Sequence, residues 1–302
     1  MKKIIYIVVA IGLVALAMCR TKEAETQALS YHKLEGTVFH TIYHITYQGE
    51  RDYHDEIKQL FKEFDGSLSM FNDTSIITRM NNCDTSVAAN RYFRHVFTKA
   101  MEVSEATGGA FDITVAPLVN LWGFGFKNSD NVSQAAIDSI LQFVGYKTVH
   151  LDEEGHLHKD DPRTIMDASS IAKGYMSDVV ADFLREQGVE NYMVEIGGEV
   201  ALNGVNPKGS RWSIGINKPT DDSTQVNSEL QDILSSTVIA RDCMTADAYA
   251  TAFMVLGKEK AMEVLAKDTT LMAYFIVDAP DADGNGGYEI VFSPALEQRL
   301  KR

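Results

Sequence analysis

The sequence has little cysteine, little proline and no cluster of basic residues. Its 302 residues include 3 cysteines and 6 prolines, and 28 Lys and Arg stand against 42 Asp and Glu, a formal net charge of -14. An acidic chain without a Lys/Arg cluster lacks the positive surface that binds a phosphate backbone, so no nucleic-acid partner is expected. No Cys/His spacing is typical of zinc, and Cys83 and Cys243 are more simply two free thiols than a disulfide.

Several common catalytic signatures are also absent. The sequence contains no GxGxxG, no P-loop, no HExxH and no GxSxG motif, so Rossmann and serine-hydrolase interpretations have no support. Its hydrophobic content of 45% is sufficient for one substantial core. Helical and strand patterns are mixed along the chain rather than alternating regularly, which favours an α+β fold, and the length alone permits one large domain or two smaller ones.

The N-terminus carries the longest apolar run. Two lysines precede the run 4–18, which is too short for a stable transmembrane helix and ends at Cys19. This arrangement resembles a bacterial lipobox, although Met18 is bulkier than the usual small residue, and an uncleaved anchor is the alternative. We therefore expect a lipoprotein signal at 1–19, a polar tether at 20–33 and a folded domain at 34–302, in the cell envelope on the periplasmic face of the inner membrane.

Hydrophobic spacing and turn residues predict the order of elements within that domain. The expected elements are a strand or hairpin in 36–49, helices at 52–64, 90–107 and 133–143, a hairpin over 147–166, a helix at 171–186, a strand at 192–196, two strands in 199–207 and 211–219, a strand at 236–240, helices at 245–256 and 258–266, and a final hairpin.

Two segments in the first two thirds of the chain carry residues that a plain core would not need. In 107–125, a Gly-Gly pair precedes Phe111 and Asp112, which could offer an apolar face and an acceptor to a ligand; a helix end running into a buried strand is the alternative. In 166–180, Ser169 and its neighbour Ser170 are expected to cap a helix whose free N–H groups, with Lys173, suit a pyrophosphate; simple capping beside a surface lysine is the alternative.

Two further segments follow. In 194–204, a Gly-Gly pair flanked by Glu195 and Glu199 predicts a tight turn after a strand, near a pocket or as plain turn chemistry. In 242–257, Asp247 and Thr251 lie four residues apart on one helix face, where their oxygens could bind Mg²⁺ or Ca²⁺. The alternative is a local hydrogen bond from Thr251 back to the carbonyl of Asp247.

The order of these segments is more specific than any one of them. The stretches "GTVFHT", "SMFNDTSIITRMN", "GGAFDITVAPLVNLWGFG", "MDASSIAKGYMSDVV", "EIGGE", "WSIGINKP" and "TADAYATAFMVLG" occur in the order and spacing of the ApbE family, which the chain resembles over about residues 34–292. The resemblance implies a single α+β domain of the T-fold type. It also implies an FAD:protein FMN transferase that uses Mg²⁺, releases AMP and modifies a Thr or Ser of an exported flavoprotein subunit of the Rnf or Na⁺-pumping NADH:quinone reductase type.

The same resemblance assigns residues by position. The expected FAD contacts are Phe39, Phe71, Ala110, Phe111, Asp112, Ser169 and Lys173. The expected metal ligands are Asp247, Thr251 and a carbonyl near Ala172.

One interval departs from the family pattern. Between "GINKP" (215–219) and the strand at 236–240, the family carries an "SG-x-Y" turn and an "H-x-x-D-P-x-T-G" loop; both are missing here, and no histidine follows His158. The chain therefore has an apparent internal deletion near 220–236, and no catalytic residue is assigned. A Mg²⁺-dependent FAD pyrophosphatase and a flavin-binding lipoprotein without catalysis stay open as alternatives.

Overall fold

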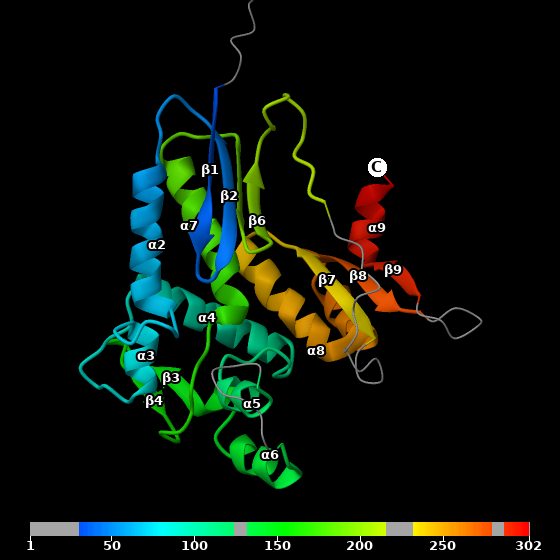
Figure 1. Ribbon diagram of the computed structural model, residues 1–302. Helices are drawn as coiled ribbons and strands as arrows, with labels where there is room; N and C mark the ends of the chain where they lie inside the picture. The colour runs from blue at the N-terminus through cyan, green and yellow to red at the C-terminus, as the bar shows by residue number, and fades with distance from the viewer. Residues whose placement is uncertain (1–29, 124–131, 216–231, 280–286, 302) are drawn as a thin grey trace, which may run out of the picture.

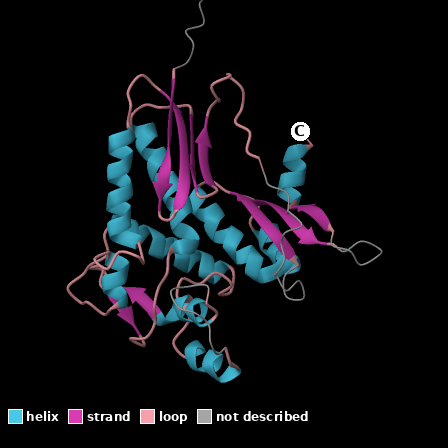
Figure 2. Cartoon of the chain, in the orientation of Figure 1, coloured by secondary structure: helices cyan, strands magenta, loops and turns pink. Residues whose placement is uncertain are grey.

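A computed structural model describes residues 30–123, 132–215, 232–279 and 287–301. The element order is β1 (Tyr31–Val38), β2 (Thr41–Gln48), α2 (His54–Leu68), α3 (Ile76–Asn81), α4 (Arg91–Ala106), α5 (Ala116–Leu121), α6 (Gln134–Leu141), a 3₁₀ turn η1 (Tyr146–Thr148), β3 (Val149–Leu151), β4 (Leu157–Lys159), α7 (Ser169–Glu186), β5 (Tyr192–Ile196), β6 (Glu199–Asn203), β7 (Ile233–Ile239), α8 (Cys243–Lys267), β8 (Met272–Asp278), β9 (Tyr288–Phe292) and α9 (Pro294–Leu300). Helices and strands are mixed along one chain, as the sequence predicted, and the α+β class is confirmed (Figure 2).

The larger sheet is antiparallel and has the order β1-β2-β5-β6. On β2, alternate residues Tyr43, Ile45 and Tyr47 are buried, because side chains one residue apart on a strand point to opposite faces. Their partners on β5 are buried as well, so one face of this sheet is apolar and the other is exposed to solvent.

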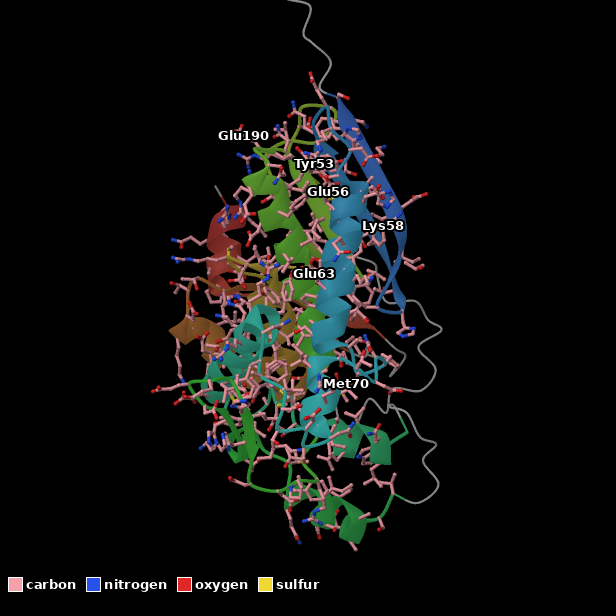
Figure 3. The ribbon with its side chains drawn as sticks, turned by 90° about the vertical axis from the view of Figure 1, so that its left-hand side faces the viewer. Tyr53, Glu56, Lys58, Glu63, Met70 and Glu190 are labelled. Carbon is pink, nitrogen blue, oxygen red and sulfur yellow. The ribbon has the colours of Figure 1, made fainter. Side chains whose placement is uncertain are left out.

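Two long helices cover the apolar face of this sheet. In α2 the residues Ile57, Phe61 and Phe64 recur at helical spacing and are buried, and α7 packs between α2 and β5. Figure 3 looks onto α2, with Tyr53 at its start and Met70 just beyond its end. The chain that leaves α2 at Met70 forms one wall of the site described below.

The second sheet, of order β7-β8-β9, packs on α8. Phe253 of α8 meets Phe275 of β8 edge to face, with ring centroids 5.7 Å apart. The long helix α8 is interrupted at Gly257, whose φ of 73° and ψ of 169° are not helical. The two helices expected at 245–256 and 258–266 are therefore confirmed as two helical segments that meet at this glycine.

A smaller part of the chain, with β3, β4, α5 and α6, lies at the lower end of Figure 1. The hairpin β3–β4 turns at Gly155, which has a φ of 95° as its Glu-Gly sequence predicted. Cys83, near this hairpin, is free and exposed, and Cys243 is free and buried, so the two cysteines do not form a disulfide.

The structure corrects several boundaries. Residues 31–33, predicted as tether, belong to β1, because Tyr31 pairs with Gln48 and its hydroxyl donates to the Val205 carbonyl at 2.8 Å. The described part of the strand predicted at 211–219 makes only an isolated bridge between Val205 and Arg211. The helices α3, α5 and α9 are short and were not predicted, and β7 begins three residues earlier than expected.

The N-terminal segments predicted as signal and most of the tether lie outside the described residues, as does most of the interval with the apparent deletion. Within the described ranges, no helix combines the length and apolar character needed to cross a bilayer.

Candidate functional site

A cavity of about 930 Å³ lies where the β1–β2 turn, the end of α2, α5 and the start of α7 meet. This volume is within the usual range for small-molecule sites. Of the seven residues expected to contact FAD, it is lined by Phe39, Phe71, Ser169 and Lys173, and one of the three expected metal ligands, Ala172, also lines it. The structure therefore places expected residues from three separate segments of the sequence on one cavity.

The β1–β2 turn supplies an aromatic wall. Phe39 and His40 form a two-residue hairpin turn with φ values of 50° and 60°, a left-handed conformation that non-glycine residues adopt only where the surroundings enforce it. Phe39 packs on Phe64 with ring centroids 5.5 Å apart, and His40 lies 4.4 Å from the exposed ring of Phe71. A flat ring entering the cavity would meet aromatic side chains here.

The start of α7 forms the opposite wall, but its capping differs from the prediction. Ser169 and Ser170 lie inside the first turn, and Asp167 accepts the N–H of Ser169 at 2.8 Å through Oδ1. The N–H groups of Ile171 and Ala172 are bonded to Ala168, so most of the expected free donors are already satisfied. Attraction of an anion at this end therefore depends on Lys173 and the helix dipole more than on free N–H groups.

Helices α7 and α8 touch at Gly174. A Cβ at this position would stand 2.5 Å from the Cys243 carbonyl oxygen and 2.7 Å from the Asp247 Cβ, so only glycine permits the contact. The N–H of Gly174 donates to Asp247 Oδ2 at 2.9 Å. The Asp247 carboxylate therefore contacts the residue that follows Lys173, which lines the cavity; Asp247 and Thr251 are not themselves lining residues.

Asp247 is a buried acid in an otherwise apolar part of α8. Only 7% of it is exposed, and burial raises the pKa of its carboxyl to about 7, although Lys173 and the Gly174 N–H act in the opposite direction. Its Oδ1 makes no hydrogen bond with any described residue, and Thr251 makes no hydrogen bond back to the Asp247 carbonyl. The alternative of a local hydrogen bond from Thr251 to the Asp247 carbonyl is therefore absent from the structure.

The expected metal ligands are of the chemical type that a small hard cation prefers. One carboxylate oxygen of Asp247, the hydroxyl of Thr251 and a carbonyl of the first turn of α7 are oxygen ligands of the type that Mg²⁺ and Ca²⁺ prefer. Two buried oxygens near this end of α8, Glu199 Oε2 and Thr245 Oγ1, have no hydrogen-bond partner among the described residues. Within the same residues, no three His, Cys, Asp or Glu side chains lie close enough together to form a metal cluster. Asp247 is the one acid among the three expected ligands.

Lys173 carries the positive charge of the site. Its Nζ donates to Glu199 Oε1 at 3.0 Å, and the side chains are only 30% and 19% exposed. Burial lowers the pKa of Lys173, but Asp247 and Glu199 outweigh it, so the pKa is raised above its ordinary value. The ammonium ion therefore stays charged at the cavity wall.

The segment 110–112 does not line the cavity. Phe111 is 1% exposed within the core, and both carboxylate oxygens of Asp112 are bonded to the protein, to Thr114 and to the N–H of Tyr146. The expectation that Phe111 presents a free face and Asp112 a free acceptor is therefore not supported by this geometry. Ala110 directly follows the glycine pair at the end of α4, which agrees with the helix end of the alternative, but no strand follows there: Val115 forms only an isolated bridge with Ile165.

Two acids near the site were not assigned from the sequence. Glu199 was noted only as a flank of the glycine turn, and its position directly after that turn was the available signal. Asp178 is the other, and its role is structural: its two carboxylate oxygens accept the N–H groups of Cys243 and Met244 at 2.9 and 2.8 Å. Asp178 thus holds the N-terminus of α8 onto α7.

Comparison with known proteins decides the family. The model of the ApbE family matches residues 39–232 and 226–275, which is more than half of the sequence. The chain belongs to the ApbE family. The two matched stretches overlap at 226–232, so the break in the match falls in the interval where the sequence lacks two family motifs.

Relatives in the ApbE family are similar over almost their whole length. The FAD:protein FMN transferase of Vibrio cholerae is 33% identical over 91% of this chain and 94% of its own. That of Haemophilus influenzae is 32% identical over 92% and 94%. The solved structure of the flavin transferase ApbE from Vibrio cholerae superposes with a TM-score of 0.80 at 31% identity, covering 89% of this chain and 99% of its own.

Proposed function

We propose that this protein is an FAD:protein FMN transferase that transfers FMN from FAD to a hydroxyl of an acceptor protein and releases AMP. The observation that carries the proposal is the joint position of the aromatic cavity, Lys173 and the buried acid Asp247. A flat ring system, a pyrophosphate and a divalent cation each find the matching chemistry within this one site. The names of its relatives support the same activity.

FAD binding is assigned to the cavity itself. Phe39 and Phe71 provide apolar faces for the ring system, and Lys173, held at the start of α7, provides the charge that orients the pyrophosphate. The dipole of α7 adds a favourable field of about 0.3–1 kcal/mol for an anion at its N-terminus.

Metal dependence is assigned to Asp247, Thr251 and the carbonyl of Ala172, with Mg²⁺ as the expected ion. A cation held there would withdraw charge from the phosphorus under attack and from the departing AMP. The protein's own contribution is to keep the Asp247 carboxylate in place through the Gly174 N–H and to exclude water from behind the cavity wall.

A lipid anchor at Cys19 would place the domain at the periplasmic face of the inner membrane, where exported flavoprotein subunits of the Rnf or Na⁺-pumping NADH:quinone reductase type are available as acceptors. The polar residues that follow Cys19 would separate the domain from the bilayer.

One assay tests the activity against its two alternatives. The protein is incubated with FAD, Mg²⁺ and an acceptor domain, and the intact mass of the acceptor is followed together with free FMN and AMP. A gain of one FMN by the acceptor, with AMP released, supports transfer. Free FMN without acceptor labelling identifies a pyrophosphatase, and bound but intact FAD identifies a binding protein; either result contradicts the proposal.

A further inference from the structure

Lys173 lies near two carboxylates and is bonded to only one of them. Its Nζ donates to Glu199 Oε1 at 3.0 Å, whereas Asp247 forms no ion pair with it and acts on its charge only through space. Asp247 is also the only acid among the expected metal ligands. An ammonium ion and a divalent cation would therefore attract the same carboxylate.

The backbone holds Glu199 in the position that it occupies. The β5–β6 turn at Gly197 and Gly198 has φ values of 64° and 101°, and a Cβ on Gly197 would stand 3.0 Å from the Lys173 Cδ. The stem of Lys173 thus packs on the bare turn, and Glu199 follows directly as the cross-strand partner of the buried Ile196. Ser177 fixes the strand to α7 by donating its hydroxyl to the Glu199 carbonyl at 3.1 Å.

A purely structural role does not account for Glu199. Its Oε2 is buried and has no hydrogen-bond partner among the described residues, which is unfavourable for a carboxylate oxygen. A glutamine would keep the shape of the side chain and an acceptor for Lys173 without burying a charge. What glutamine cannot do is hold the ammonium ion by charge in competition with Asp247.

We propose that Glu199 is a positioning residue that draws the Lys173 ammonium ion away from Asp247 and so leaves the Asp247 carboxylate available to a divalent cation. The inference rests on the cation site of the proposed function. Without the charge of Glu199, Lys173 turns to Asp247, because opposite charges attract strongly in a poorly solvated site. Lys173 then competes from within the protein for the cation's ligand.

The test is a titration of the full chain with Mn²⁺ at fixed pH, in which electron paramagnetic resonance measures the free ion and Mg²⁺ displaces the bound ion. We expect E199Q to weaken Mn²⁺ binding roughly tenfold, equivalent to about 1.4 kcal/mol. E195Q is the matched control: it removes the same charge from the same hairpin, but Glu195 pairs with His44 at 3.1 Å in a partly exposed position, so binding should not change. In the transfer assay, E199Q should raise the half-saturating Mg²⁺ concentration and leave kcat at saturating Mg²⁺ close to wild type.

A second background separates positioning from direct attraction of the cation by Glu199. In K173Q there is no ammonium ion to release, so adding E199Q should weaken Mn²⁺ binding little or not at all. An equal loss in both backgrounds, or no loss from E199Q alone, overturns the inference. E199A, which also removes the charge, replaces E199Q in the same comparison if thermal unfolding shows that E199Q is not folded.

The outcomes also separate this inference from the proposed function. If the wild-type protein binds no Mn²⁺, the proposed cation site is wrong, and the role inferred for Glu199 is wrong with it. If the wild-type protein binds Mn²⁺ and only the pattern across the variants fails, the inference alone is wrong. If the pattern holds but no FMN reaches an acceptor, the transferase assignment is wrong and the role of Glu199 stands.

Discussion

Replacing Gly174 by alanine tests the contact on which the whole site depends. Alanine favours a helix over glycine by about 1 kcal/mol, so in a free helix the substitution would stabilise the protein. At Gly174 the added Cβ would lie 2.5 Å from a backbone carbonyl oxygen and 2.7 Å from the Asp247 Cβ, and neither atom is the end of a flexible side chain. Overpacking of this kind costs about 1–3 kcal/mol, so we expect a net loss of up to about 2 kcal/mol.

Gly66 of α2 is the matched control for this substitution. It is also a helical glycine, but a Cβ there would meet no atom within 4 Å, so G66A should gain up to about 1 kcal/mol. The free energy of unfolding of both variants is measured by urea denaturation, with cation binding as a second measurement. If G174A is as stable as G66A and binds the cation as wild type does, the close approach of α7 and α8 at Gly174 is required neither for stability nor for the position of Asp247.

Three further substitutions probe the site. D247A removes the acid that we propose as a metal ligand and should lower Mg²⁺-dependent turnover by at least roughly 100-fold. D73A, on the exposed surface, should not lower it, and full activity in D247A would refute the metal assignment. F71A should weaken FAD binding roughly tenfold in a fluorescence titration without lowering the Tm, since Phe71 is 65% exposed, and W122A, exposed but outside the cavity, is the control. Burial raises the pKa of the Asp178 carboxyl from its ordinary value near 4 to about 6. The folded state therefore holds the carboxyl proton more tightly than the unfolded state, and the contribution of Asp178 to stability falls as pH rises from about 4 to about 6. The stability advantage of wild type over D178N, from urea midpoints, should therefore shrink across that window, and an advantage that grows with pH contradicts the shift.

The helix ends and turns that depend on local interactions were predicted from the sequence. The end of α4 at a glycine pair, the turn at Gly155 and the break of α8 at Gly257 each follow from a glycine with positive φ at the predicted place. Phe39 and Lys173 were placed at the site through the resemblance, and the structure puts both on one cavity.

Contacts between distant segments were not predictable from the sequence. Asp112 looked available as a ligand, but its partner Tyr146 lies 34 residues further along the chain. Lys173 and Glu199 are 26 residues apart and meet only because the β5–β6 turn folds back over α7. Composition shows that such polar groups exist, whereas only the fold shows which of them are already satisfied.

The contact between α7 and α8 contributes both to the stability of the fold and to the position of the site residues. Gly174 and Asp178 lie four residues apart on one face of α7, and both bond to α8: the Gly174 N–H to the Asp247 side chain, and the Asp178 carboxylate to the N–H groups of Cys243 and Met244. The Asp247 carboxylate is therefore positioned by the backbone of α7 and by the anchoring of its own helix. Lys173 is adjacent to the same contact, so any change in the separation of the two helices moves the buried acid relative to the ammonium ion. Burial raises the pKa of the Asp247 carboxyl, so burying it costs free energy. If Asp247 binds a cation as proposed, this cost has a reason, because a carboxylate held in place before the cation arrives binds it with less loss of conformational freedom.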